Sequence, residues 1–166
     1  MALNSSFPQN GARLLAMLAL IDSMANRDYK KRERAVRALE RLWRPDSAKP
    51  NTSSGISWCI LSRDWMKEAQ RLGLPTDLVL WTRKVLESAR KATKDVSPSV
   101  QYHGWRLLRK VVETIADQAE QAAVRRLAVP ELRVALESEY TMVRSVAVGL
   151  LRDFKALPLL PPVQIG

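Results

Sequence analysis

The stretch DYKKRERAVRALERLWR, residues 28–44, predicts a half-buried helix on which positive charge is concentrated. Its apolar side chains recur every three or four residues, which is the rhythm of a helix with one side against a core. The opposite side carries cations at the spacing i, i+4, i+7, i+11 and i+14. We call this line of side chains, about 20 Å long at the helical rise, the cationic ridge; it consists of Lys30, Arg34, Arg37, Arg41 and Arg44.

The charge of the ridge is open to three interpretations. Residues 30–44 contain seven Lys or Arg and two Glu, a net charge of +5, which is half of the +10 of the whole chain. Like charges one turn apart repel by a few tenths of a kcal/mol, so binding to a polyanion would relieve a cost. The first interpretation is a solvated face with ordinary ion pairs, from Glu33 to Arg37 and from Glu40 to Arg44. The second is a site for nucleic-acid phosphates. The third is a site for an anionic membrane surface.

Composition restricts the class of protein further. A chain of 166 residues with 46% hydrophobic residues suits one folded domain, and a mean hydropathy of -0.20 without a long uncharged apolar run predicts a soluble protein. The single cysteine, Cys59, excludes an internal disulfide, and one cysteine with one histidine, His103, cannot form a Cys/His zinc site of standard ligand count. We therefore expect an intracellular protein, cytoplasmic or nuclear, without metal or cofactor. A homo-oligomer is compatible with this composition.

Helical periodicity recurs along the rest of the chain, and we find no strand pattern. The expected helices cover about 11–25, with Asn10 as a candidate cap, 28–44, 56–72, 76–94, 97–127, a short segment restarting at Pro130, and 140–156. The predicted fold is all-α: a compact single-domain bundle of about seven helices. Its predicted organisation is a flexible end at 1–10, a helical domain at 11–156 with a long loop at 44–55, and a Pro-rich tail at 157–166.

Three of the expected helices share a pattern of small and apolar residues, at 35–42, 104–111 and 147–154. Helical-hairpin repeats of the HEAT kind use inner helices of this sort, with a period of about 40 to 47 residues. The irregular offsets, 69 and then 43 residues, favour chance over a true repeat. HEAT-like helical hairpins are therefore kept as an alternative form of the predicted bundle.

A second group of cations is expected on the helix at 76–94, on the side away from its apolar residues. The net charge of this segment is +3. The five cations are Arg83, Lys84, Arg90, Lys91 and Lys94.

The sequence offers little for catalysis. It contains no Gly-rich phosphate loop, no nucleophile elbow and no cluster of metal ligands. Cys59 and His103 are a conceivable nucleophile pair, but Cys59 lies between Trp58 and Ile60, where a free cysteine is usually core filler. We predict that the protein is not an enzyme.

Three further motifs suggest binding. Residues 68–84 have the small residue, turn glycine and apolar spacing of a helix-turn-helix. A purely structural helix-turn-helix is favoured here over one that reads DNA. Trp43, at the edge of the basic helix, is a candidate for stacking on a base or for insertion at a membrane, with boundary packing as the commoner role. The basic-x-x-Pro-x-x-Pro pattern of Lys155, Pro158 and Pro161 fits SH3-type partners.

The leading hypothesis is a non-enzymatic protein that binds nucleic acid, RNA rather than DNA, through phosphate contacts from the ridge and the second group of cations. The first alternative is a HEAT-like helical adaptor with an acidic protein partner. The second alternative is a matrix-like peripheral protein on an anionic membrane surface.

Overall fold

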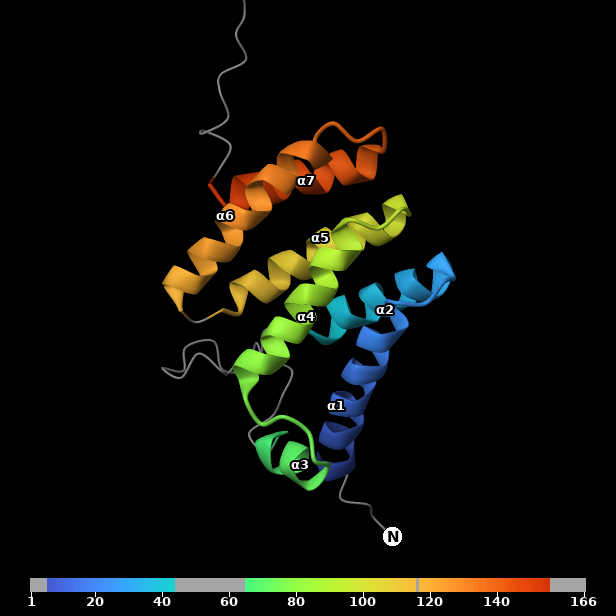
Figure 1. Cartoon of the computed structure of the whole chain (residues 1–166), viewed down its shortest axis with the longest axis vertical. Coiled ribbons are helices and arrows are strands. Elements are labelled where there is room, and N and C mark those ends of the chain that lie inside the picture. Colours follow the sequence, from blue (N-terminus) through green and yellow to red (C-terminus); the bar gives the residue numbers. More distant parts are fainter. Residues whose placement is uncertain (1–5, 44–64, 116, 156–166) are drawn as a thin grey trace, which may run out of the picture.

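The computed structural model describes residues 6–43, 65–115 and 117–155, which form seven α-helices and no strand (Figure 1). The prediction of an all-α fold with about seven helices is confirmed. The helices are α1 (Ser6–Ser23), α2 (Tyr29–Leu42), α3 (Trp65–Arg71), α4 (Leu78–Thr93), α5 (Pro98–Glu113), α6 (Gln118–Ala135) and α7 (Thr141–Asp153). All of the loop at 44–55 and all of the tail at 157–166 lie outside the described residues.

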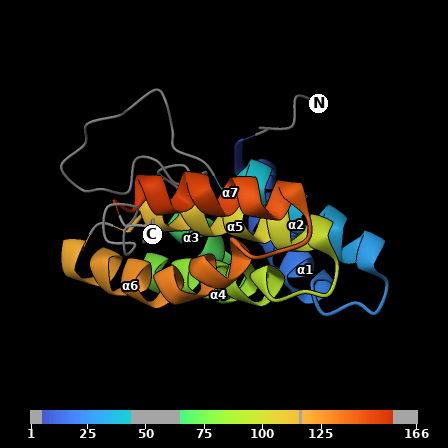
Figure 2. The same cartoon turned by 90° about the horizontal axis from the view of Figure 1, so that it is seen from above.

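Six of the helices pair into three successive hairpins, α1 with α2, α4 with α5 and α6 with α7. Their second helices, α2, α5 and α7, run in the same direction (Figure 1), and α5 packs against both of the others. Seen from above, these three lie on one side of the molecule, and α4 and α6 lie on the other (Figure 2). The three segments with a shared spacing therefore lie on the three helices of one layer, and a HEAT-like relationship between them stays a prediction.

The core lies between the two layers, and α5 is its central helix. Its buried side chains, Trp105, Leu108 and Val111 among them, meet α2, α4, α6 and α7. This confirms the central position predicted for this segment. Burial of apolar area of this kind is the dominant stabilising term in a domain of this size.

The predicted single helix over 97–127 is wrong, because α5 ends at Glu113 and α6 begins at Gln118. The Thr114 hydroxyl donates to the carbonyl of Val111 at the end of α5, and the Asp117 carboxylate accepts from the Ala119 N–H at 2.9 Å. These two polar side chains satisfy backbone groups at the break between α5 and α6. The apolar periodicity of the sequence continues across this break and therefore does not reveal it.

The predicted restart at Pro130 is also wrong, since Pro130 lies inside α6. It sits on the exposed side of that helix, where water can satisfy the carbonyl that lacks its N–H partner. Helix α1 likewise begins at Ser6 and contains Asn10, so the proposed cap at Asn10 is wrong.

The other predicted helix boundaries that fall on described residues agree with the structure to within a few residues, while the predicted start at 56 lies outside the described residues. The Asp28 carboxylate caps α2 by accepting from the Lys30 N–H at 3.0 Å, and Asp77 caps α4 by accepting from the Val79 N–H at 2.9 Å. Gly73, with φ of +70°, follows α3 in the left-handed conformation that favours glycine. Local signals therefore fix the start of the helix that carries the ridge.

Candidate nucleic-acid interface

Helix α2 turns four of the five predicted ridge residues to solvent. Its buried side chains are Ala35, Val36, Leu39 and Glu40, followed by the cap residue Trp43. The exposed ridge cations on the opposite side are Lys30, Arg34, Arg37 and Arg41. Arg44 lies outside the described residues. The rotation of α2 about its axis is therefore the one that the apolar periodicity predicts.

The two glutamates of α2 do not neutralise the described part of the ridge. Glu33 accepts a hydrogen bond from the Ser99 hydroxyl of α5, and Glu40 is 5% exposed and directed at α5. Within the residues that the structure describes, no carboxylate forms an ion pair with the four exposed ridge cations. The expected pair between Glu33 and Arg37 is thus not formed, and the interpretation of an ordinary ion-paired face loses its support.

Glu40 is instead the centre of a cluster with three basic side chains of α5. Its Oε2 lies 3.0 Å from His103 Nδ1 and its Oε1 lies 2.6 Å from Arg106 Nε. The Lys110 ammonium donates to the Glu40 carbonyl oxygen at 2.9 Å and lies 3.9 Å from Oε1. Burial by itself raises the pKa of Glu40, but the hydrogen bond with His103 and the charges of Arg106 and Lys110 outweigh it, so this pKa lies below its ordinary value. The carboxylate is held ionised and directed inward.

A groove of about 590 Å³ lies between α1 and α2 beside the ridge. Four cations of α2 line it together with small and apolar side chains, and no carboxylate is among the residues lining it: Leu20, Ser23, Lys31, Arg34, Ala35, Arg37, Ala38 and Arg41. Sequence reasoning missed Lys31, which follows Lys30 by 100° around the helix. Only the position of α1 shows that Lys31 shares a groove with the ridge.

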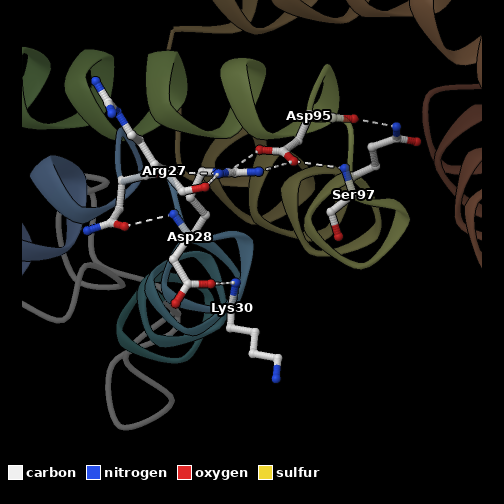
Figure 3. A network of polar contacts seen from close by, with 8 residues as sticks. Arg27, Asp28, Lys30, Asp95 and Ser97 are labelled. Carbon is white, nitrogen blue, oxygen red and sulfur yellow. Dashed lines mark hydrogen bonds and ion pairs between the residues drawn. The ribbon is translucent and has the colours of Figure 1, made fainter.

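Arg32 is the one cation of α2 that is withdrawn from this surface by an ion pair in the described part of the chain (Figure 3). Its Nε and Nη2 donate to the two Asp95 oxygens at 2.7 and 3.0 Å, and its Nη1 donates to the carbonyls of Asn26 and Arg27. Asp95 also accepts from the Ser97 N–H at 2.9 Å. The loop before α2 is thereby tied to the loop between α4 and α5, which fixes the start of the ridge helix.

The second predicted group of cations is only partly free. Arg90 and Lys94 lie 3.5 and 3.4 Å from the same Glu131 oxygen on α6. The remaining three are exposed, and none of them forms an ion pair within the described residues; we call them the α4 patch: Arg83, Lys84 and Lys91. Helices α2 and α4 lie in different layers (Figure 2) but contact each other, and no residue of the α4 patch lines the groove beside the ridge.

Trp43 is not available for stacking or for membrane insertion. It is 1% exposed, and its indole N–H donates to the Thr114 hydroxyl at 3.1 Å. The stacking and insertion roles considered for Trp43 are wrong, whereas the packing role that was favoured for it is confirmed, because α5 and the Thr114 turn cover its side chain. Trp81 and Trp105 are buried as predicted, while Trp58 and the side chain of Trp65 lie outside what the structure describes.

The helix-turn-helix interpretation of residues 68–84 is also wrong. Helix α3 packs against α1, and close contacts between α3 and α4 are absent from the described residues. The Trp81 indole donates to the Pro75 carbonyl at 2.7 Å and so holds the linker against α4. The turn glycine is present, but the two helices do not cross as a DNA-reading unit requires.

The structure describes little of the remaining sequence motifs. Cys59, Pro158 and Pro161 lie outside the described residues, and Lys155 ends the described chain in an exposed turn. The described ranges contain no group of three or more potential metal ligands. Within the same ranges, no helix has the length and apolar character needed to cross a membrane.

The chain was compared with protein-family models, curated proteins and solved structures, and no match was found in any of the three. A function is therefore inferred from the geometry of α2 and its surroundings.

Proposed function

We propose that the protein is a non-enzymatic nucleic-acid-binding protein that contacts phosphates through α2. The observation that carries this proposal is the division of charge on one helix. The exposed ridge cations have no carboxylate partner in the described chain, whereas Glu33 and Glu40 are both engaged by α5. A surface of unpaired, aligned cations is what a polyanionic backbone binds.

The mechanism is counterion release. Each phosphate that a Lys or Arg neutralises frees condensed cations, so affinity falls linearly with the logarithm of salt concentration. Lys31 joins the ridge at the groove, which gives α2 five cations without an ion pair in the described chain. Five phosphate contacts correspond to a logarithmic slope of roughly -4.5 on a duplex and roughly -3.5 on a single strand.

The proposal favours RNA over DNA. Sequence-specific DNA readers place a helix in the major groove by a supporting motif, and α3 and α4 do not form one. Contacts to phosphates alone suit recognition of RNA by shape. The proposal therefore assigns phosphate contacts to α2 and assigns no base-reading role to the described helices.

The test is salt-titrated fluorescence anisotropy with RNA and DNA of one sequence. Replacing Lys30, Arg34, Arg37 and Arg41 by Ala should reduce the slope by about 3 to 4, because about four phosphate contacts are lost. The variant should keep its fold, since alanine is the best helix former and like-charge repulsion is removed. Circular dichroism checks the fold.

The matched control replaces the three residues of the α4 patch by Ala. If the ridge carries the main contact, this control changes the slope by less than the ridge variant does. A ridge variant that binds RNA and DNA with unchanged affinity and slope would overturn the assignment of the contact to α2. Wild-type protein that binds neither RNA nor DNA would overturn nucleic-acid binding and leave the adaptor with an acidic protein partner. Retained binding to anionic vesicles with no binding to nucleic acid would favour the membrane alternative.

A further inference from the structure

The groove between α1 and α2 has apolar lining residues that phosphate binding does not explain. Leu20 of α1 and Ala35 and Ala38 of α2 line it together with four cations, and the two helices form the first hairpin (Figure 1). A phosphate is held by charged and polar groups, and small apolar side chains add little to such a contact. The groove therefore offers a second kind of contact beside the ridge, one that suits a flat group with apolar faces.

Ala38 lies between two arginines that line the same groove. It follows Arg34 by four residues and precedes Arg41 by three, so each arginine is about one helical turn away. The three positions fall within about 60° of one another around the helix, and the two arginines are about 10 Å apart along its axis. A ligand group placed over Ala38 would therefore have a guanidinium on either side.

Ser23 adds a neutral hydrogen-bonding group to the lining. Its hydroxyl donates to the Ala19 carbonyl within α1 at 2.9 Å, and a hydroxyl that donates in this way acts as an acceptor toward a ligand. No carboxylate is among the described residues that line the groove, since Glu33 and Glu40 are engaged by α5. Apolar side chains, guanidinium planes and a polar acceptor are groups that hold an unpaired base.

A single strand can supply such a base at little cost, whereas a duplex cannot. In a duplex each base is stacked and paired, and its extrusion costs free energy. In a single strand the base can enter the groove while the phosphates beside it contact the ridge. Stacking of one base on an aromatic side chain strengthens binding by roughly fivefold to a hundredfold. The groove is lined by aliphatic and guanidinium groups instead, so we expect the lower end of this range.

We propose that the protein binds single-stranded nucleic acid, with phosphates on the ridge and an unpaired base in the groove between α1 and α2. This inference rests on the proposed function and names the form of nucleic acid that the same site takes. The base contact tolerates any sequence, because every base presents a flat face to the groove. The ridge supplies the dependence on salt, and the groove adds affinity that salt does not screen.

The experiment compares a strand that has bases with one that lacks them. Fluorescence anisotropy is measured with three probes: an oligothymidylate of about 12 nucleotides, the abasic form of that oligomer, and a duplex of the same length. The abasic strand keeps every phosphate and loses only the bases. Wild-type protein should bind the abasic strand about fivefold to tenfold more weakly than the oligothymidylate, with the same salt slope.

Ala38→Leu fills the groove, keeps every cation and introduces a good helix former. It should bind the oligothymidylate about fivefold to tenfold more weakly than wild type does, and the abasic strand and the duplex within about twofold of wild type. The matched control is Ala122→Leu at an exposed position of α6, a helix that contacts neither α1 nor α2 in the described chain. This control should leave all three affinities unchanged.

A selective loss of oligothymidylate binding in Ala38→Leu supports the inference. Oligothymidylate binding by Ala38→Leu that equals wild type overturns it, and so does an equal loss for all three probes. Equal affinity of wild-type protein for the oligothymidylate and its abasic form also overturns it, and this comparison needs no variant to fold. In these cases phosphate binding by the ridge stands, whereas wild-type protein that binds none of the probes removes the proposed function as well.

Discussion

At the scale of single residues, Glu40 determines the character of the surface. Its position four residues before Arg44 predicts an ion pair along the helix, yet its carboxylate is buried and surrounded by His103, Arg106 and Lys110 of α5. A carboxylate that could have neutralised the ridge instead fastens α2 to α5. One side-chain direction thus contributes to both packing and surface charge.

We expect Glu40→Gln to destabilise the fold by about 2 kcal/mol at neutral pH, because charge-assisted hydrogen bonds to Arg106 and His103 are lost. The folded-state pKa of Glu40 lies below the ordinary value of 4.5, so its contribution is fully present above about pH 4.5. The contribution is lost as the pH falls through the folded-state pKa. Urea unfolding of both proteins from about pH 7 to about pH 3 measures this convergence.

Glu113→Gln is the matched control for Glu40→Gln. Glu113 is half exposed and pairs with Arg109 at 3.4 Å, so its loss should change the free energy of unfolding by less than about 0.5 kcal/mol. A difference between wild type and Glu40→Gln that stays constant down to about pH 3 would show that the ionised carboxylate is not its source.

At the scale of elements, α4 and α5 pack closely at Gly104. A Cβ atom built at Gly104 meets the Ala92 Cβ and the Thr93 N at 2.7 Å, whereas one built at Gly149 of α7 meets nothing within 4 Å. The two glycines occupy interior positions of helices and differ in what lies beside them. Gly104 is required by the approach of the neighbouring backbone.

We predict opposite effects for the same substitution at these two glycines. Gly149→Ala should stabilise the protein by up to about 1 kcal/mol, because alanine is the better helix former. Gly104→Ala should destabilise it by about 1 to 3 kcal/mol, because α4 must move to admit the methyl group. Thermal and urea unfolding give both values. An equal gain at both positions would mean that α4 and α5 are not in close contact there.

At the scale of the whole molecule, the pair of Arg32 and Asp95 joins the first hairpin to the second. Both side chains are mostly buried, at 15% and 11% exposed, and they are 63 residues apart in the sequence. The hydrogen bonds that Arg32 donates to Asp95 raise the pKa of Arg32 above its ordinary value, as expected for a paired guanidinium. The pair fixes the start of the ridge helix relative to the α4 layer.

A double-mutant cycle with Arg32→Ala and Asp95→Ala should give a coupling energy of about 1 to 3 kcal/mol. The cycle is needed because Arg32 also donates to two loop carbonyls and Asp95 also accepts from Ser97. Urea unfolding of the four proteins supplies the data. Coupling below about 0.5 kcal/mol would show that this ion pair does not hold the two hairpins together, which leaves that role to the apolar packing and to the contacts of Glu33 and Glu40 with α5.

The sequence by itself determined the all-α class, the rotation of α2 about its axis, and helix caps such as Asp28 and Asp77. These features depend on residues within a few positions of one another, where apolar periodicity and side-chain bonds to the backbone act directly. The prediction of helix boundaries failed at Thr114, because the apolar spacing continues through the break between α5 and α6. It failed at Pro130, because this proline lies on the exposed side of α6 and does not end the helix.

Only the tertiary structure decided which charges remain free. Glu40, Arg32 and Arg90 find partners on segments distant in the sequence, and Trp43 is covered by α5. Lys31 joins the ridge because α1 lies beside it. Ion pairing and burial depend on distances between elements, and no local sequence pattern encodes those distances. The sequence therefore supplies the cations, and the packing of the helices determines which of them remain exposed and unpaired.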